Sequence, residues 1–190
     1  MFKSTAGIGQ GGLPLGKNPK VQIPKPTCVR EVIVQSDMAW ATATLGSGSV
    51  LVGYHLNKPP SKESWNGWLS TKKQEIADNK LARVVVFTEG GAPSKDQQTQ
   101  LRNTVYPEWS ARNISARVGI QIVTSNPIFG SLVSATVAVL RVSARALGFD
   151  RIIEFYGNIE GALEFVAIPP REWDAIKSIR DYLSQELRKS

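Results

Sequence analysis

The sequence predicts an α/β protein with an open, mostly parallel β-sheet, an antiparallel edge and helices on both faces. Three segments are nearly continuous apolar runs, as parallel strands buried on both faces require: residues 84–87, 118–123 and 152–156. Segments with helical spacing separate these runs, which favours strand–helix–strand crossovers. Nearer the N-terminus, two β-branched segments follow one another too closely for a crossover, so they predict an antiparallel hairpin at the edge.

The strands are predicted from β-branched and aromatic residues that are bounded by turn residues. They cover residues 30–36, 38–45, 50–56, 82–88, 116–124 and 150–156. A turn rich in glycine and serine, at residues 46–49, joins the second strand to the third. These two strands therefore form the predicted hairpin.

The helices are predicted from apolar spacing and from capping residues. They cover residues 61–79, 94–105 and 127–147, a segment that opens at Asn158, and an amphipathic segment that follows Pro169 and Pro170. The first helix has Trp65, Trp68, Leu69 and Ile76 as its inward face, and the last has Trp173, Ile176, Ile179, Leu183 and Leu187. The resulting order of elements is β-β-β-α-β-α-β-α-β-α-α.

Residues 1–29 are expected to form a flexible, basic tail rich in glycine and proline, and residues 30–190 a single domain with an added C-terminal helix. Five of the seven net positive charges lie within residues 1–30, which contain no acid. Such a segment has too few apolar anchors to offset its ordering entropy. Residues 7–12 match GxGxxG, but no strand or helix is predicted around them, so no nucleotide site is expected there. Contact of the tail with nucleic acid or an anionic membrane is the less favoured alternative.

The scarcity of cysteine and histidine limits the chemistry that the chain offers. Cys28 is the only cysteine and His55 the only histidine. An intramolecular disulfide is excluded and too few ligands are left for a usual zinc site, so neither a metal nor another cofactor is predicted. With 21% charged residues and no apolar run at the N-terminus, the sequence favours a soluble, cytoplasmic protein.

The residues expected to form a binding site lie where the predicted parallel strands end. In an open sheet the turns after the carboxyl ends of the strands meet at one edge, and ligands and partners bind there. The candidate residues are His55, Thr88, Glu89, Gly90, Gly91, Ser94, Thr124, Ser125 and Asn126. Glycines permit unusual backbone conformations, and amides at a helix start attract an anion or a phosphorylated side chain. The interpretation that we favour is simpler: the glycines make the turn, and Ser94 or Asp96 caps the helix.

The order of elements over residues 37–168, with a helix that opens right after Val-Val-Val-Phe-Thr at 84–88, resembles the STAS domains of bacterial anti-anti-sigma factors and their STAS-like relatives. The resemblance implies the α/β fold predicted above and a regulatory role through binding of a protein partner. In that family the turn carries Asp-Ser-Ser/Thr-Gly, whose serine is phosphorylated by a partner kinase. This chain has Thr88-Glu89-Gly90-Gly91 there and its serine, Ser94, comes later, so the resemblance does not extend to the phosphorylation motif.

Three hypotheses of function follow. The first is a non-enzymatic regulatory or scaffold module that binds a protein partner through the strand-end turns. The second is a small-molecule or nucleotide-binding domain, or an enzyme, that uses the same edge with His55; catalysis is not expected, because neither G-x-S-x-G nor a P-loop is present. The third is a subunit of a homo-oligomer or filament in which the tail docks on a neighbour. Apolar residues surround most of the helix at 127–147, Val139 and Val142 among them, so the C-terminal helix or another subunit is expected to cover it.

Overall fold

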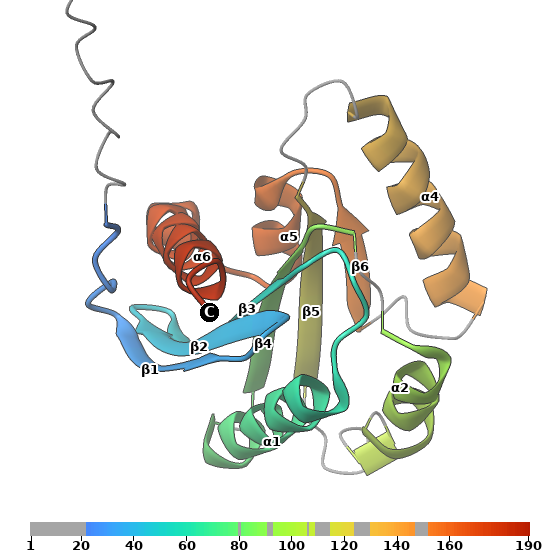
Figure 1. Ribbon diagram of the computed structural model, residues 1–190, viewed down its shortest axis with the longest axis horizontal. Coiled ribbons are helices and arrows are strands. Elements are labelled where there is room, and N and C mark those ends of the chain that lie inside the picture. The colour runs from blue at the N-terminus through green and yellow to red at the C-terminus, as the bar shows by residue number, and fades with distance from the viewer. Residues whose placement is uncertain are drawn as a thin grey trace, which may run out of the picture.

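A computed structural model describes residues 22–79, 81–90, 93–105, 107–108, 115–123, 130–146 and 152–190 of the chain. Its centre is a six-stranded sheet in which the spatial order of the strands follows the order of the chain (Figure 1). The strands are β1 (Val29–Val34), β2 (Met38–Leu45), β3 (Gly48–His55), β4 (Leu81–Thr88), β5 (Ser115–Ile122) and β6 (Ile153–Tyr156). Every predicted strand is present, with ends within three residues of those predicted.

The strand directions confirm the predicted fold class. β1, β2 and β3 pair antiparallel, whereas β3, β4, β5 and β6 run parallel to one another. The turn between β2 and β3 is held by two buried charged residues. Arg83 donates from Nη1 to the Ser47 hydroxyl at 2.8 Å, and the Ser47 amide donates to Glu172 at 2.9 Å. Gly48 has a φ of 113°, a left-handed conformation that favours glycine.

Five α-helices are described, and together they cover both faces of the sheet. They are α1 (Lys62–Asn79), α2 (Lys95–Gln100), α4 (Gly130–Ala146), α5 (Ile159–Phe165) and α6 (Trp173–Leu187). Because the parallel strands are adjacent in chain order, right-handed crossovers put α1, α2 and α4 on one face. α5 and α6 pack on the other (Figure 1). Within the described residues, no helix has the length and apolar character needed to cross a bilayer.

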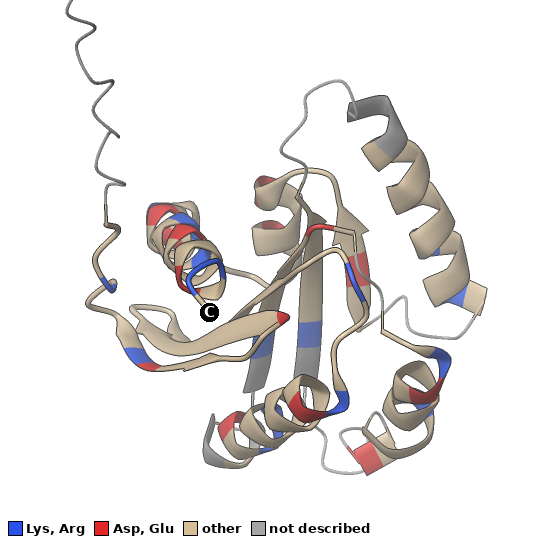
Figure 2. Cartoon of the chain, in the orientation of Figure 1, with Lys and Arg blue, Asp and Glu red and all other residues tan. Residues whose placement is uncertain are grey.

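Two short turns of other helical types adjoin these helices. A π-helical turn, η1 (Leu101–Val105), extends α2, so the predicted helix at 94–105 is α-helical only in its first part. A 3-10 turn, η3 (Pro170–Glu172), leads into α6. Acidic and basic residues are interspersed along α6 (Figure 2), as is usual for a helix with one solvent-facing side.

Side chains of the central strands alternate between two apolar cores. Val52 of β3 and Val85 and Phe87 of β4 pack with α5 and α6. The alternate positions, such as Leu51 and Val84, belong to the core that contains the tryptophans of α1. Successive residues of a strand point to opposite faces of its sheet. The position of a residue along β3 or β4 therefore decides which half of the molecule its side chain enters.

Asp37 fixes the start of α1, a role that the sequence analysis did not assign. Its buried carboxylate accepts the Ser61 amide at 2.6 Å and the Ser64 hydroxyl. Ser61 is the predicted N-cap, and its hydroxyl accepts the Ser64 amide at 3.2 Å. Burial acts to raise the pKa of Asp37, but the hydrogen bonds from Ser64 and Ser61 outweigh it and hold this pKa below its usual value. The stabilisation is therefore lost as pH falls through the lowered pKa.

α6 buries its predicted apolar stripe against the antiparallel edge of the sheet. Ile176, Ile179 and Leu183 are fully buried, and Trp173 is half-buried with its indole N–H donating to a backbone carbonyl at 2.8 Å. This places α6 on the sheet face opposite to α4. Of the two alternatives for covering the 127–147 helix, the C-terminal helix is therefore excluded, because α6 packs on the other core, and another subunit stays a prediction. Val139 and Val142 of α4 are 64% and 67% exposed.

The described part of the predicted tail contacts the domain. The Ile23 amide donates to the side chain of Gln185 on α6 at 2.9 Å, and the Thr44 amide donates to the Cys28 carbonyl at 3.0 Å. β1 begins at Val29, one residue before the predicted start of the domain. Residues 1–21 of the predicted tail lie outside the described residues.

Candidate functional site

The turn from β4 to α2 contains the residues that the sequence analysis placed at its centre. Gly90 has a φ of 116°, and open space surrounds it, so the backbone conformation is the reason for glycine there. Ser94 is the N-cap of α2: its hydroxyl accepts the Gln97 amide at 3.3 Å, and the Gln97 side chain accepts the Ser94 amide at 2.8 Å. This reciprocal pair is a capping box. The capping interpretation of Ser94 is confirmed.

Replacing Ser94 by alanine is expected to destabilise the protein by about 1 kcal/mol, because the Gln97 amide loses its acceptor at the helix start. Ser94→Asp keeps a cap and is expected to stay within about 0.5 kcal/mol of the wild type. Urea denaturation of the three proteins measures both changes. A loss well above that of an ordinary cap in Ser94→Ala would show that the hydroxyl has a further role.

His55 and Thr88 come together at the carboxyl edge of the sheet, as predicted. They are paired in the parallel register of β3 and β4, and His55 Nδ1 lies 3.3 Å from the Thr88 hydroxyl. The Thr88 hydroxyl also accepts the Gly90 amide at 3.2 Å. Both side chains are buried, with 4% and 7% of their surface exposed. A kinase therefore reaches the Thr88 hydroxyl only if this edge of the sheet opens.

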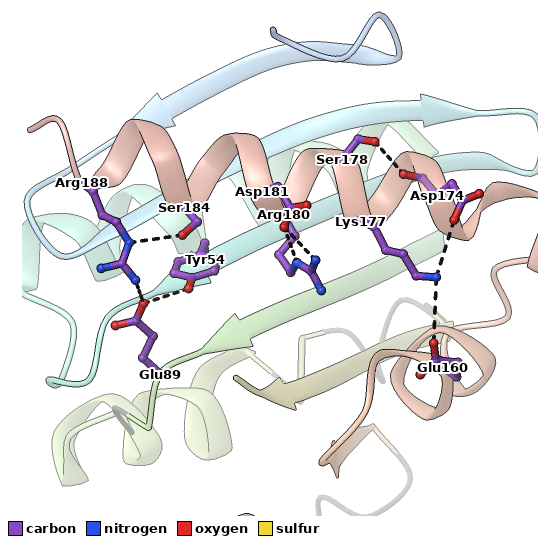
Figure 3. A network of polar contacts seen from close by, with 10 residues as sticks. All are labelled: Tyr54, Glu89, Glu160, Asp174, Lys177, Ser178, Arg180, Asp181, Ser184 and Arg188. Atoms are coloured by element: carbon purple, nitrogen blue, oxygen red, sulfur yellow. Dashed lines mark hydrogen bonds and ion pairs between the residues drawn. The ribbon is translucent and has the colours of Figure 1, made fainter. Parts of the chain in front are cut away.

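Glu89 lies on the opposite face of the sheet from His55. Its carboxylate accepts the Tyr54 hydroxyl at 2.9 Å and is paired with Arg188 at the end of α6 (Figure 3). Arg188 in turn donates to Ser184 at 3.5 Å. Burial raises the pKa of Tyr54, and the Glu89 carboxylate adds to this effect. Glu89 thus ties the strand-end turn to α6, and its side chain lies on the other face of the sheet from the side chain of His55.

The remaining predicted site residues cannot be placed with these. Gly91, Thr124, Ser125 and Asn126 lie outside the described residues. β5 does end beside this edge, because the Val123 amide donates to the Thr88 carbonyl at 2.7 Å. The predicted convergence of strand ends is therefore confirmed for the described parts of the first two turns.

A cavity of about 360 Å³ lies beneath the sheet edge, between the sheet and the helices α1, α2 and α4. Val86, Ile120 and Ile122 line it from the sheet, and Trp65 and Trp68 line it from α1. Most of the remaining lining is also apolar. Protein interiors are packed as densely as organic crystals and contain few voids larger than a water molecule. A space of this size is therefore much larger than the voids of an ordinary protein interior.

The exposed and buried residues of the lining show how the cavity is oriented. Thr136 and Ser143 of α4 and Gly90 of the turn from β4 to α2 are exposed and also line the cavity, so it opens to solvent along α4 and at this turn. His55 and Thr88 are buried polar residues that line it at the carboxyl ends of the strands. The predicted pair of site residues therefore contributes buried polar groups to the wall of the cavity.

Lys72 is a cavity-lining residue that the sequence analysis missed. It is 4% exposed, and its Nζ lies 5.7 Å from the ring centroid of Trp68. Burial lowers the pKa of Lys72 from 10.5 to about 7. The signal was present in the sequence: Lys72 falls seven residues after Trp65 and four after Trp68, on the helical stripe that the tryptophans define. A lysine at such a position buries its methylene chain against the apolar face, and in this fold its amine is buried as well.

Comparisons of this chain with family models, with curated proteins and with solved structures found no match. The fold and the cavity define the protein as an α/β domain with a mostly parallel sheet and an internal apolar cavity on the face covered by α1, α2 and α4. Its likeness to STAS domains stays a prediction.

Proposed function

We propose that this protein binds a small apolar molecule in the cavity between the sheet and α4. The observation that carries the proposal is the combination of the cavity's size, about 360 Å³, with its largely apolar lining. Small-molecule sites in proteins are mostly apolar spaces of roughly 300–1,000 Å³ with a few polar groups. The sequence analysis had named a small-molecule-binding domain as its second hypothesis and had placed the site at the sheet edge with His55. The proposal keeps that class of function and places the site in the cavity between the sheet and α4.

The volume limits the size of the ligand. An engineered apolar cavity of about 150 Å³ holds benzene, with six heavy atoms. At the same cavity volume per ligand atom, a cavity of about 360 Å³ therefore accommodates a ligand of roughly 14 heavy atoms. Ligands of this size include a medium-length alkyl chain and a fused aromatic ring system, but not a dinucleotide.

The two other hypotheses rest on surface features that the structure describes only in part. A partner-binding turn would present Gly90 and Ser94, which are exposed, while Thr88 and Glu89 are engaged within the domain. A homo-oligomer would use the exposed valines of α4, Val139 and Val142. Both hypotheses stay predictions, and the size and the tryptophan-containing lining of the cavity are the reasons for preferring the small-molecule proposal.

The test uses 1-aminonaphthalene, an uncharged fused-ring probe within this size limit whose emission shifts to shorter wavelength when it leaves water. We expect saturable binding of one probe per chain and energy transfer from Trp65 and Trp68, which line the cavity. Ala144 is a buried residue of α4 that also lines it. Ala144→Phe fills part of the space, so it is expected to weaken probe binding by about tenfold or more.

The matched control is Ala138→Phe, the same substitution at an exposed position of the same helix. It is expected to leave probe binding within about twofold of the wild type, because its ring points to solvent. Thermal unfolding of each variant establishes that it is folded. Absence of saturable binding by the folded wild type, or equal binding by both folded variants, contradicts a ligand site in this cavity.

A further inference from the structure

The solvent-facing side of α4 is apolar. Its exposed residues on this side, which we call the α4 outer face, are Ala135, Ala138, Val139, Val142 and Ala146. With about 3.6 residues per turn, these positions fall within an arc of about 100°. Val139 and Val142 are 64% and 67% exposed. A surface helix usually turns charged or polar residues to solvent, as α6 does, so the α4 outer face indicates an interaction surface.

The α4 outer face lies between the mouth of the cavity and two arginines. On one border, Thr136 and Ser143 line the cavity and are exposed. On the other border are Arg141, which pairs with Glu154 at 2.5 Å, and Arg145, which is exposed. The sequence of α4 contains no acidic residue (Figure 2). An apolar strip therefore has an opening into the apolar cavity on one side and positive charge on the other.

We propose that α4 docks on an anionic lipid bilayer through its outer face, with Arg145 at the lipid phosphates and the mouth of the cavity next to the lipid. A helix of this kind lies in the plane of the interface, buries its apolar side at the boundary of the acyl chains and keeps its basic groups among the head groups. The docking goes beyond the proposed function and is linked to it. A small apolar ligand collects in lipid and enters the cavity from there without crossing water.

Charge decides between a bilayer and a second copy of the chain as the occupant of this surface. The chain has a net charge of +7, and residues 1–30 contribute five positive charges without an acid. A second copy seated on α4 brings the same net charge and a second Arg145, and its α4 supplies no acid to balance them. Anionic lipids supply the opposite charge, and each basic residue near the membrane surface strengthens the attraction.

The docking is expected to be weak and reversible. Valine and alanine bury less apolar surface than the tryptophan, phenylalanine and leucine of a strong interfacial helix. The apolar contact and the electrostatic attraction are therefore both needed. Because salt screens the attraction between charges that are exposed to water, binding is expected to fall as ionic strength rises.

The experiment measures co-sedimentation of the full chain with large vesicles of phosphatidylcholine, alone or with about 30% phosphatidylglycerol. For the wild type at low ionic strength we expect binding to the anionic vesicles to be at least about tenfold stronger than to the neutral ones. A protein with both Val139→Ser and Val142→Ser keeps its net charge and loses most of the apolar contact. It is expected to bind the anionic vesicles about tenfold or more weakly than the wild type.

A matched pair of substitutions separates the place of a charge from its sign. Val142→Glu and Ser178→Glu each add one negative charge at an exposed position, the first on the α4 outer face and the second on α6, across the sheet. Val142→Glu is expected to weaken binding by about tenfold or more. Ser178→Glu is expected to stay within about twofold of the wild type, because salt screens charges over about 10 Å. Thermal unfolding establishes that each variant is folded.

The outcomes separate this inference from the proposed function. A double serine variant that binds like the wild type shows that charge alone holds the chain on lipid, and it overturns the role of α4, as do equal affinities of Val142→Glu and Ser178→Glu. Self-association in sedimentation velocity without vesicle binding assigns the α4 outer face to a second copy and overturns the inference. If vesicles do not bind but 1-aminonaphthalene does, the docking falls and the proposed function stands. Vesicle binding without probe binding has the reverse meaning.

Discussion

Replacing Gly119 by alanine is expected to lower the free energy of unfolding by about 3 kcal/mol, although the substitution adds only one methyl group. Gly119 lies in β5, and a Cβ atom there would stand 2.5 Å from the carbonyl oxygen of Ala162 in α5. It would also stand 3.1 Å from the carbonyl carbon of the same residue. These are backbone atoms, so no side-chain rotation relieves the contact. α5 must move away from the sheet, which opens the core between them.

Urea denaturation of Gly119→Ala measures this loss, and two further proteins identify its cause. Ala162→Gly in the Gly119→Ala background is expected to restore little, because the clash is with the main chain of Ala162. Gly157→Ala is the control: its Cβ would meet only a Val133 methyl group at 3.4 Å, so its stability is expected to stay within about 0.5 kcal/mol. A loss below about 1 kcal/mol in Gly119→Ala would contradict the close packing of α5 on β5.

The fold was accessible to sequence analysis because its strands and helices carry strong local patterns. The apolar runs of β4 and β5 and the stripe of α6 with Ile176 and Ile179 need no tertiary information to be found. Whether the C-terminal helix or another subunit covers α4 was left open by the sequence, for a physical reason. Which face of a sheet a C-terminal helix occupies depends on the core left open by the preceding crossovers, and here α6 closes the core over β1, β2 and β3.

The candidate site was predicted in part. That strand ends meet at one edge follows from parallel pairing, and His55 and Thr88 do pair there. The separation of Glu89 from His55 also follows from strand alternation, since Glu89 shares its parity with Phe87, which faces α6. The cavity itself could not be predicted. Its volume depends on the distance between α4 and β5, and the hydrophobic periodicity of the sequence does not encode such a distance.

Lys72→Met is expected to stabilise the folded protein by about 2–4 kcal/mol at pH 6, because a buried ammonium is replaced by an apolar side chain of similar size. The pKa of Lys72 is about 7 in the folded protein and near its usual 10.5 in the unfolded chain. Between these values the unfolded chain binds more protons, so this group makes the wild type more stable as pH rises. Below pH 7 both states are protonated, and the full penalty is present.

The gain from Lys72→Met is therefore expected to be largest at or below pH 7 and to shrink steadily toward pH 10. Urea denaturation of wild type and variant at pH 6, 7.5 and 9 measures the difference. Lys73→Met, at an exposed position beside it, is expected to change stability by less than about 0.5 kcal/mol at every pH. A gain that is the same at pH 6 and pH 9 would show that Lys72 keeps its usual pKa and that its amine reaches water.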